Sequence, residues 1–288
     1  MVRCDAVQDT KRIATMKTFH SREEGLWTGE DRRFESLPST NSWALEHLHD
    51  LQEGDVVRAD AQTAGRGRFG RAWFAVPGKC LTLSVVLKDP AWIPLGPNLG
   101  QIAALALLAL ARGLEITAQV KWPNDLMVND HKTAGILVER HVSGAGFVVG
   151  IGLNVNVAMT DFDQAGLDRP ATSLALAAGH PIDCDVVRTV LYRELARRLD
   201  EARNRGLSHV WDEWRRHDWL TGHSVRILGG DGEWTAGEYM GICPDGGLRL
   251  NIGDAGETIF LAGDVERLAL SEAPQRACVS PSVLARSS

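Results

Sequence analysis

The stretch that most restricts the fold of this 288-residue chain is a segment rich in glycine and arginine. It reads Gln62-Thr-Ala-Gly-Arg-Gly-Arg-Phe-Gly-Arg-Ala-Trp73. Glycine accepts backbone conformations that other residues avoid and lets a ligand approach the main chain closely. Arginine presents a planar cation that pairs with phosphate or carboxylate oxygens, and the tryptophan adds a flat apolar face. The stretch therefore predicts a mobile loop that encloses an anionic ligand.

The glycines of this loop also match the dinucleotide-binding pattern G-x-G-x-x-G between Gly65 and Gly70. That pattern is meaningful only where it follows a strand and opens a helix. Here a Pro-Gly pair at 77–78 follows, and the apolar run 81–87 is typical of a strand. Because no helix is expected to open on these glycines, we reject a Rossmann domain.

The length suits one large domain and one small domain. Hydrophobic residues make up 44% and charged residues 24% of the chain, which is ordinary for a globular protein. The net charge of −6 does not favour a nucleic-acid-binding surface. The arginines of the loop are therefore a local feature, which indicates a small anionic ligand.

Cysteine spacing and the polar N-terminus indicate a cytoplasmic protein. The five cysteines lie far apart, so no disulfide framework, metal site or redox motif is predicted. The first 35 residues contain no apolar signal core. The longest apolar run, Ile102–Ala111, is too short to span a bilayer, and no membrane partner is expected.

Periodicity and turn residues divide the chain into four parts. They are an N-terminal arm at 1–35, an α/β domain at 36–220, a small β domain at 221–270 and a tail at 271–288. In the α/β domain we expect helices at 43–51, 99–112, 186–203 and 207–219, a short one starting at 172, and strands at 55–60, 81–88, 117–122 and 146–156. In the small domain we expect strands at 224–228, 234–242, 248–252, 258–261 and 265–268.

A second motif surrounds a hairpin predicted from Leu126–Val128 and Lys132–Arg140, joined by 129–131. Pro123 should break the preceding strand. We therefore expect the polar side chains just before the hairpin to leave the regular ladder and converge; they are Lys121, Asn124 and Asp125. Glycines in the strands nearby should leave backbone open; they are Gly135, Gly150 and Gly152.

Ser39-Thr40-Asn41 stands directly before the first expected helix. These residue types commonly cap a helix N-terminus. They could also hold a polar ligand group there. The residues alone favour capping.

Together these motifs resemble the signature of biotin protein ligases. The resemblance rests on the loop 62–73, on Lys121-Trp-Pro-Asn-Asp125 and on Lys132-Thr-Ala-Gly-Ile-Leu-Val-Glu139, in that order, and covers roughly residues 36–268. It implies an α+β catalytic domain of the class II aminoacyl-tRNA synthetase type, followed by an SH3-like β barrel. It also implies a two-step reaction. Biotin and MgATP give biotinyl-5′-AMP and pyrophosphate, and biotin then passes to a lysine of a biotin carboxyl carrier protein.

The resemblance also implies roles for individual residues. Biotin is expected to contact Ser39, Thr40, Asn41, Gln62, Gly65, Arg66, Gly67, Arg68, Lys132, Gly135 and Gly150. ATP is expected to contact Arg66, Arg68, Arg71, Trp73, Lys121, Asn124, Asp125, Lys132 and Asn154. The residues expected to act in catalysis are Lys132, Arg66, Arg68 and Asp125.

Three other functions fit the sequence less well than a biotin protein ligase. A lipoate or octanoate ligase or transferase of the same fold would not carry this loop, and the transferase would need a catalytic cysteine. A biotin-sensing regulator would need a DNA-binding module, for which the first 35 residues are too short. A non-catalytic binding module would leave Lys121–Lys132 unexplained. We therefore expect a ligase that does not bind DNA.

Overall fold

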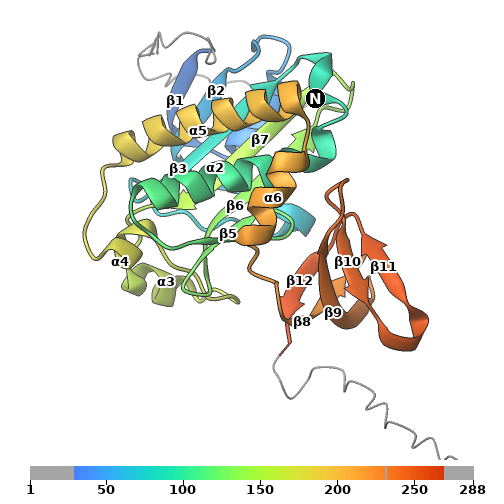
Figure 1. The fold of residues 1–288 in the computed structure, drawn as a ribbon. Helices are drawn as coiled ribbons and strands as arrows, with labels where there is room; N and C mark the ends of the chain where they lie inside the picture. The colour runs from blue at the N-terminus through green and yellow to red at the C-terminus, as the bar shows by residue number, and fades with distance from the viewer. Residues whose placement is uncertain (1–28, 231, 269–288) are drawn as a thin grey trace, which may run out of the picture. The chain divides into compact units, whose positions relative to one another are not determined.

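The computed structural model describes residues 29–230 and 232–268, which form two units (Figure 1). The first unit holds the chain through Trp219 together with residues 244–246. The second unit holds 220–243 and the chain from 247 onward. Within the described part of the chain, no helix is both long and apolar enough to cross a membrane.

The first unit is built on a seven-stranded mixed sheet with the order β1-β2-β3-β7-β6-β5-β4. Its strands are β1 Asp31–Leu37, β2 Val56–Gln62, β3 Cys80–Leu87, β4 Gln119–Lys121, β5 Asp125–Val128, β6 His131–Arg140 and β7 Phe147–Asn154. Only the edge pair β1–β2 is parallel. Because β2 and β3 are antiparallel and joined by the glycine-arginine loop, no βαβ unit forms there, and the rejection of a Rossmann domain is confirmed.

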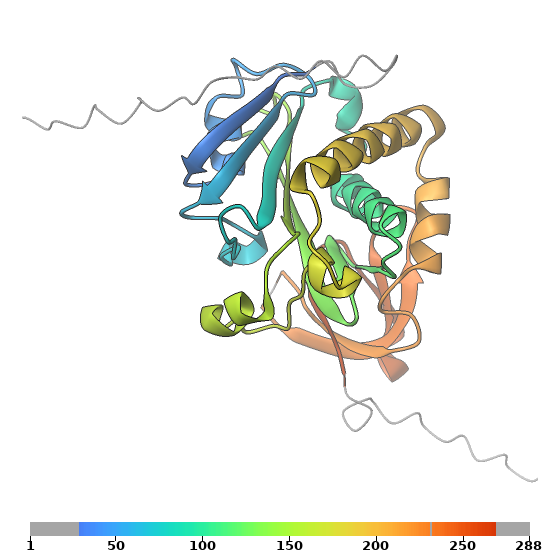
Figure 2. The ribbon, with the colours of Figure 1, turned by 90° about the vertical axis from the view of Figure 1, so that its left-hand side faces the viewer.

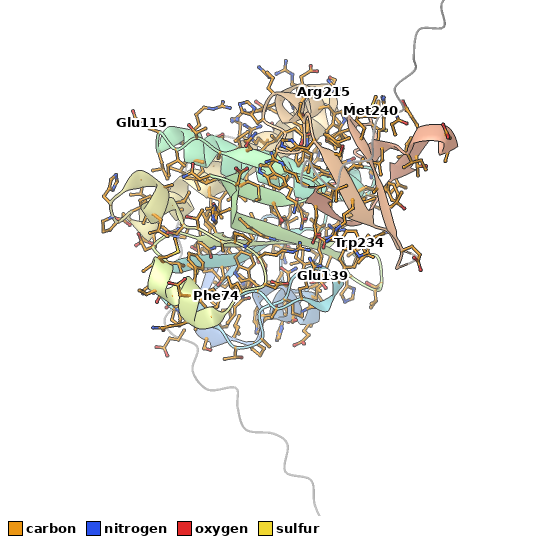
Figure 3. All side chains as sticks on the ribbon, turned by 90° about the horizontal axis from the view of Figure 1, so that it is seen from below. Phe74, Glu115, Glu139, Arg215, Trp234 and Met240 are labelled. Carbon is orange, nitrogen blue, oxygen red and sulfur yellow. The ribbon has the colours of Figure 1, made fainter. Side chains whose placement is uncertain are left out.

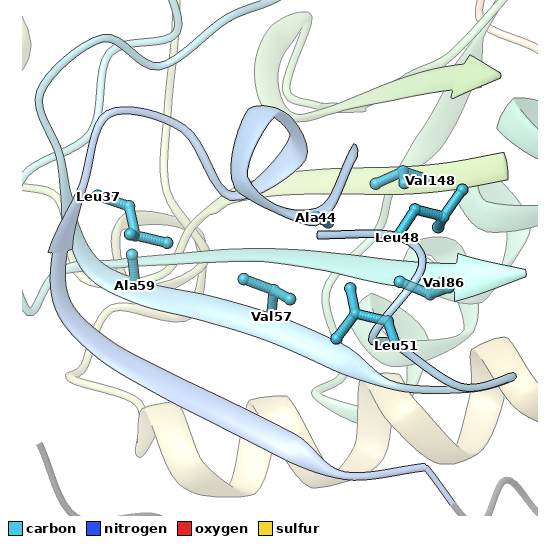
Figure 4. Packing of buried hydrophobic residues seen from close by; sticks show 8 residues of the cluster. All are labelled: Leu37, Ala44, Leu48, Leu51, Val57, Ala59, Val86 and Val148. Carbon is cyan, nitrogen blue, oxygen red and sulfur yellow. The ribbon is translucent and has the colours of Figure 1, made fainter. Parts of the chain in front are cut away.

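Helices cover both faces of this sheet (Figure 2). The helices of this unit are α1 Thr40–Glu46, α2 Leu99–Gly113, α3 Met159–Ala165, α4 Leu174–Ala178, α5 Cys184–Arg205 and α6 Ser208–Arg216. The nearly all-apolar α2 is buried on most sides, between the sheet and α5, as expected for a helix without a polar face. The short α1 packs on the opposite face through Ala44, which joins Leu48, just after the helix, in a cluster with Val57, Val86 and Val148 (Figure 4).

The second unit is a five-stranded antiparallel sheet with the order β11-β10-β9-β8-β12. Its strands are β8 Ser224–Leu228, β9 Trp234–Ile242, β10 Leu248–Asn251, β11 Glu257–Phe260 and β12 Asp264–Arg267. Residues of β8 and β10 are buried in alternation, and the buried apolar side chains of this unit include Val225, Ile227, Tyr239, Leu248, Leu250 and Val265. The five strands expected from the turn residues are confirmed, within one residue at either end.

The structure corrects the sequence predictions at several places. Strand β1 begins inside the stretch expected to be an arm, because Asp31 pairs with the Arg58 guanidinium of β2 at 2.8 Å. A single 3₁₀ turn, Arg68–Gly70, forms in the glycine-arginine loop. Helix α3 was not predicted. Helix α1 begins at Thr40 and ends at Glu46, three and five residues earlier than expected, and α6 ends at Arg216, three residues before the expected end. Residues 1–28 and the predicted tail 271–288 lie outside the described residues.

Candidate active site

The face of the large sheet that carries α1 has glycines at its centre. Cross-strand pairing places Ser84 of β3 beside Gly150 of β7, and Gly150 beside Leu137 of β6. The next row along the same face runs through Thr82, Gly152, Gly135 and Asp125. Because glycines stand at the centre of both rows, other groups can lie directly on the backbone there. We call this area the glycine floor.

A buried polar cluster borders the floor at the start of α1. Ser39 caps the helix, and its hydroxyl accepts the Ser42 N–H at 3.4 Å. Gln62 Oε1 accepts the Thr40 N–H at 2.8 Å and lies 3.2 Å from the Thr40 hydroxyl. Capping is therefore confirmed for Ser39. The side chains of Thr40 and Gln62 instead join β2 to the helix start, where a ligand could meet them.

Asn41 extends this cluster onto the floor. Its Oδ1 accepts the Ser84 hydroxyl at 2.6 Å, and its Nδ2 donates to Leu137 O at 3.1 Å and to Glu139 Oε2 at 2.9 Å. A Cβ at Gly150 would lie 2.1 Å from Asn41 Oδ1. The glycine is therefore required for the carboxamide to sit where these three bonds hold it, with one Oδ1 lone pair left to accept another donor.

The glycine-arginine loop is folded by its own backbone bonds. The Gly67 N–H donates to Arg71 O at 2.7 Å, and the Trp73 N–H donates to Gly65 O at 2.9 Å. Phe69 at its tip has φ +55° and is 60% exposed. Non-glycine residues rarely adopt that conformation.

At the end of the loop, the Trp73 indole lies on the glycine floor. A Cβ at Gly152 would lie 2.3 Å from Trp73 Cε2, and one at Gly135 would lie 3.2 Å from Cζ3. The indole nitrogen is buried and makes no hydrogen bond. Buried hydrogen-bond donors normally have partners. The Trp73 indole N–H is therefore suited to donate to an acceptor atom of a ligand.

Charged groups gather at the other end of the floor. Lys132 Nζ lies 2.6 Å from Asp125 Oδ1, although the contact lacks hydrogen-bond alignment, and 5.8 Å from the centre of the Trp73 ring. Arg68 Nη1 donates to Asn124 Oδ1 at 3.4 Å. Of the three side chains predicted to converge before the hairpin, Asn124 and Asp125 therefore lie with Arg68 and Lys132, whereas Lys121 has a different contact.

Arg66 takes a different partner. Its Nη2 donates to both carboxylate oxygens of Glu139, at 3.0 and 2.8 Å. Glu139 lies on β6 and is labelled in Figure 3. The first arginine of the loop is thereby linked to Asn41, because both donate to the same carboxylate.

Of three residues expected on the nucleotide side, two have other contacts and one is exposed. Lys121 is buried, and its ammonium group lies 5.3 Å from the centre of the Trp219 ring. Asn154 donates to Thr172 O at 3.1 Å, which ties β7 to the segment before α4. Arg71 is exposed on the loop. Of the described residues, no three His, Cys, Asp or Glu side chains gather as a metal site.

The sequence predictions missed two side chains of this region. Ser84 is, with Thr82, one of two hydroxyl residues in the mostly apolar strand β3, and that interruption was an available signal. Glu139 stands at the end of the third motif, but only the fold shows that it meets Arg66 and Asn41.

The described cysteines do not provide a nucleophile. Burial, the main cause, raises the pKa of Cys80 to about 11 and raises the pKa of Cys184 as well, and Cys243 is buried. A thiol whose pKa lies above neutral pH stays protonated, and the thiolate is the reactive form.

Comparison with known proteins decides the family. Residues 33–156 match the biotin/lipoate A/B protein ligase family. The biotin--[acetyl-CoA-carboxylase] ligase of Paracoccus denitrificans is 32% identical over 234 residues, which cover 79% of this chain and 96% of the relative. The chain belongs to the biotin/lipoate A/B protein ligase family. Another member, the bifunctional ligase/repressor BirA of Bacillus subtilis, is 34% identical over 239 residues, or 80% of this chain and 71% of that protein.

A solved structure of this ligase family shares the fold. The biotin protein ligase from Aquifex aeolicus, in complex with biotin and ATP, aligns with a TM-score of 0.70 at 24% identity. The alignment covers 83% of this chain and 99% of the Aquifex chain. The mixed sheet and the second antiparallel sheet are therefore the biotin ligase fold.

Proposed function

We propose that this chain is an ATP-dependent biotin protein ligase. It activates biotin to biotinyl-5′-AMP with release of pyrophosphate, and it then transfers biotin to a lysine of a biotin carboxyl carrier protein. The relatives named as biotin--[acetyl-CoA-carboxylase] ligases, among them the Paracoccus protein and one from Mycobacterium tuberculosis that is 34% identical over 224 residues, support this assignment.

The observation that carries the proposal is the contrast between the two ends of the glycine floor. One end presents neutral polar groups from Thr40, Asn41 and Gln62, and the other presents Arg68 and Lys132. Biotin has the same polarity, with a neutral ureido ring at one end and a carboxylate at the other. Between the ends the Trp73 indole lies on the glycine floor and offers a flat apolar face for the ring and chain of biotin.

In the first step the biotin carboxylate attacks the α-phosphorus of MgATP, and pyrophosphate leaves. Two anions must approach one another, so the barrier is largely electrostatic. Prearranged cations lower it, at roughly 3–4 kcal/mol for a well-placed donor. We propose that Lys132, Arg66 and Arg68 supply them, and that Lys121, Asn124, Arg71, Trp73 and Asn154 line the nucleotide side.

In the second step the neutral amine of the carrier lysine attacks the biotinyl carbonyl, and AMP leaves. A free lysine has a pKa of about 10.4, so the amine must lose a proton. We propose that Asp125, which holds Lys132 in the free protein, then orients or deprotonates that amine. No enzyme nucleophile is needed, in keeping with the raised pKa values of Cys80 and Cys184.

The ATP substrate would bring a magnesium ion to the site. Mg²⁺ would be held mainly by the ATP phosphates, because this ion commonly keeps several waters and binds through phosphates and one or two carboxylates. Asp125 is a suitable carboxylate.

Residues 36–220 and the preceding β1 residues would form the catalytic domain. Residues 221–270 would form an SH3-like barrel, for which the antiparallel five-strand order is suited.

The test is biotin-dependent exchange of pyrophosphate into ATP by the purified protein. We expect exchange with biotin and at most traces with lipoate or octanoate. Exchange that depends on lipoate or octanoate instead would assign the chain to the other branch of the family, and no exchange with any of the three acids would refute the adenylation step.

A further inference from the structure

Glu139 links the glycine-arginine loop to the start of α1 through one carboxylate. Its oxygens receive the Arg66 guanidinium at 2.8 and 3.0 Å, and Oε2 also receives Asn41 Nδ2 at 2.9 Å. Arg66 comes from the loop and Asn41 from the start of α1, while Glu139 stands on the rigid strand β6. No role in the two steps above requires this carboxylate.

The two bonds differ in what they do. The Asn41 bond, together with those to Ser84 and Leu137, fixes which way the carboxamide faces. The bond to Glu139 neutralises the Arg66 guanidinium in the free protein. The activation step needs the same guanidinium to pair with the anionic group of the ligand. A guanidinium paired with one carboxylate is less available to another, because the two anions compete for it.

We propose that Glu139 is a positioning residue that keeps Arg66 in reserve in the free enzyme and releases it to the anionic group of the ligand, while it holds the Asn41 carboxamide in place. This rests on the proposed function. The binding-competent state is then only a fraction of the free enzyme, and the apparent dissociation constant rises in proportion.

The size of the effect follows from the exposure of the pair. The side chains of Arg66 and Glu139 are 44% and 25% exposed. Partly exposed ion pairs contribute little, so competition should weaken ligand binding by about two- to fivefold. The effect should vanish in salt of about 1 M, where screening is strong.

The experiment compares variants by calorimetry with biotin and with biotinamide, which lacks the carboxylate. Glu139→Gln keeps an acceptor for Asn41 but removes the charge that competes for Arg66. We expect Glu139→Gln to bind biotin about two- to fivefold more tightly than the wild type at low salt. At high salt its affinity for biotin should equal that of the wild type. Its affinity for biotinamide should equal that of the wild type at either salt concentration. Glu139→Ala also loses the Asn41 bond, so it should bind both ligands about fivefold more weakly than the glutamine variant.

Glu266→Gln is a matched control, because Arg226 and Glu266 form a 2.7 Å pair with similar exposures of 49% and 28% in the second unit. It should bind biotin as the wild type does. The inference is overturned if Glu139→Gln binds biotin no more tightly than the wild type, or if biotinamide or the control shows the same gain. Failure of the wild type to bind biotin would instead overturn the proposed function, and this inference with it.

Discussion

Replacement of Gly150 by alanine should damage the site from its floor. The new Cβ would lie 2.1 Å from Asn41 Oδ1, 2.7 Å from its Cγ and 3.0 Å from its Nδ2, all well inside normal contact distances. Gly150 lies in a strand paired on both sides, with Ser84 and Leu137. The backbone is therefore held, and the Asn41 side chain must move.

The displaced carboxamide would lose its bonds to Ser84, Leu137 and Glu139. At about 1 kcal/mol for each bond, the free energy of unfolding should fall by up to about 3 kcal/mol. If Asn41 also contacts biotin, loss of that one contact should weaken biotin binding by roughly tenfold. Urea denaturation and calorimetry measure the two effects separately.

A double-mutant cycle isolates the clash. In an Asn41→Ala background the obstructed side chain is gone, so Gly150→Ala should cost less than about 0.5 kcal/mol there. Gly113→Ala is the control, because a Cβ on this helix residue meets nothing within 4 Å. An equal cost of Gly150→Ala in both backgrounds would refute the reasoning.

The other predictions concern charged residues. Lys132→Met should slow adenylate formation by roughly 100- to 1,000-fold, because it removes a cation from the phosphoryl-transfer step, whereas Lys132→Arg should retain part of the rate; pyrophosphate exchange measures both. Arg68→Gly should release biotinyl-5′-AMP about tenfold faster or more in a filter-trapping assay, and an unchanged release rate would contradict the role of the loop. Burial opposes ionisation of Glu213, but its hydrogen bonds from Arg198 outweigh burial and lower the pKa of Glu213. The stabilisation from Glu213 is therefore present above about pH 4.5 and is lost as the pH falls through the lower pKa of the folded state. In urea titrations between pH 6 and 3, Glu213→Gln should lose less stability than the wild type, and equal losses would show that this pair does not matter.

Much of the fold could be predicted because local signals agreed with it. The apolar run of β3 and the turn residues between β5 and β6 have a local cause, and Asn129 and Asp130 do adopt positive φ at that turn. Strand β1 could not be predicted in this way. It depends on pairing with β2 and on Asp31 reaching Arg58, which is a long-range contact.

The candidate site was predictable in its residue types and not in its contacts. The glycines at 150 and 152 predicted that the backbone of this strand is accessible. Only the strand register shows that Gly135 lies beside Gly152. The loop motif ended at Trp73, yet its place on the floor follows from the folded loop. The Arg66–Glu139 pair joins residues 73 positions apart, so no local pattern could show it.

The central claim is that this site activates biotin and passes it to protein. The most direct measurement is mass spectrometry of a purified biotin carboxyl carrier domain after incubation with this protein, MgATP and biotin. We predict one added biotinyl group, on a single lysine, that requires ATP and does not form with Lys132→Met. An unmodified carrier, or a carrier acylated only when lipoate or octanoate replaces biotin, would contradict the account.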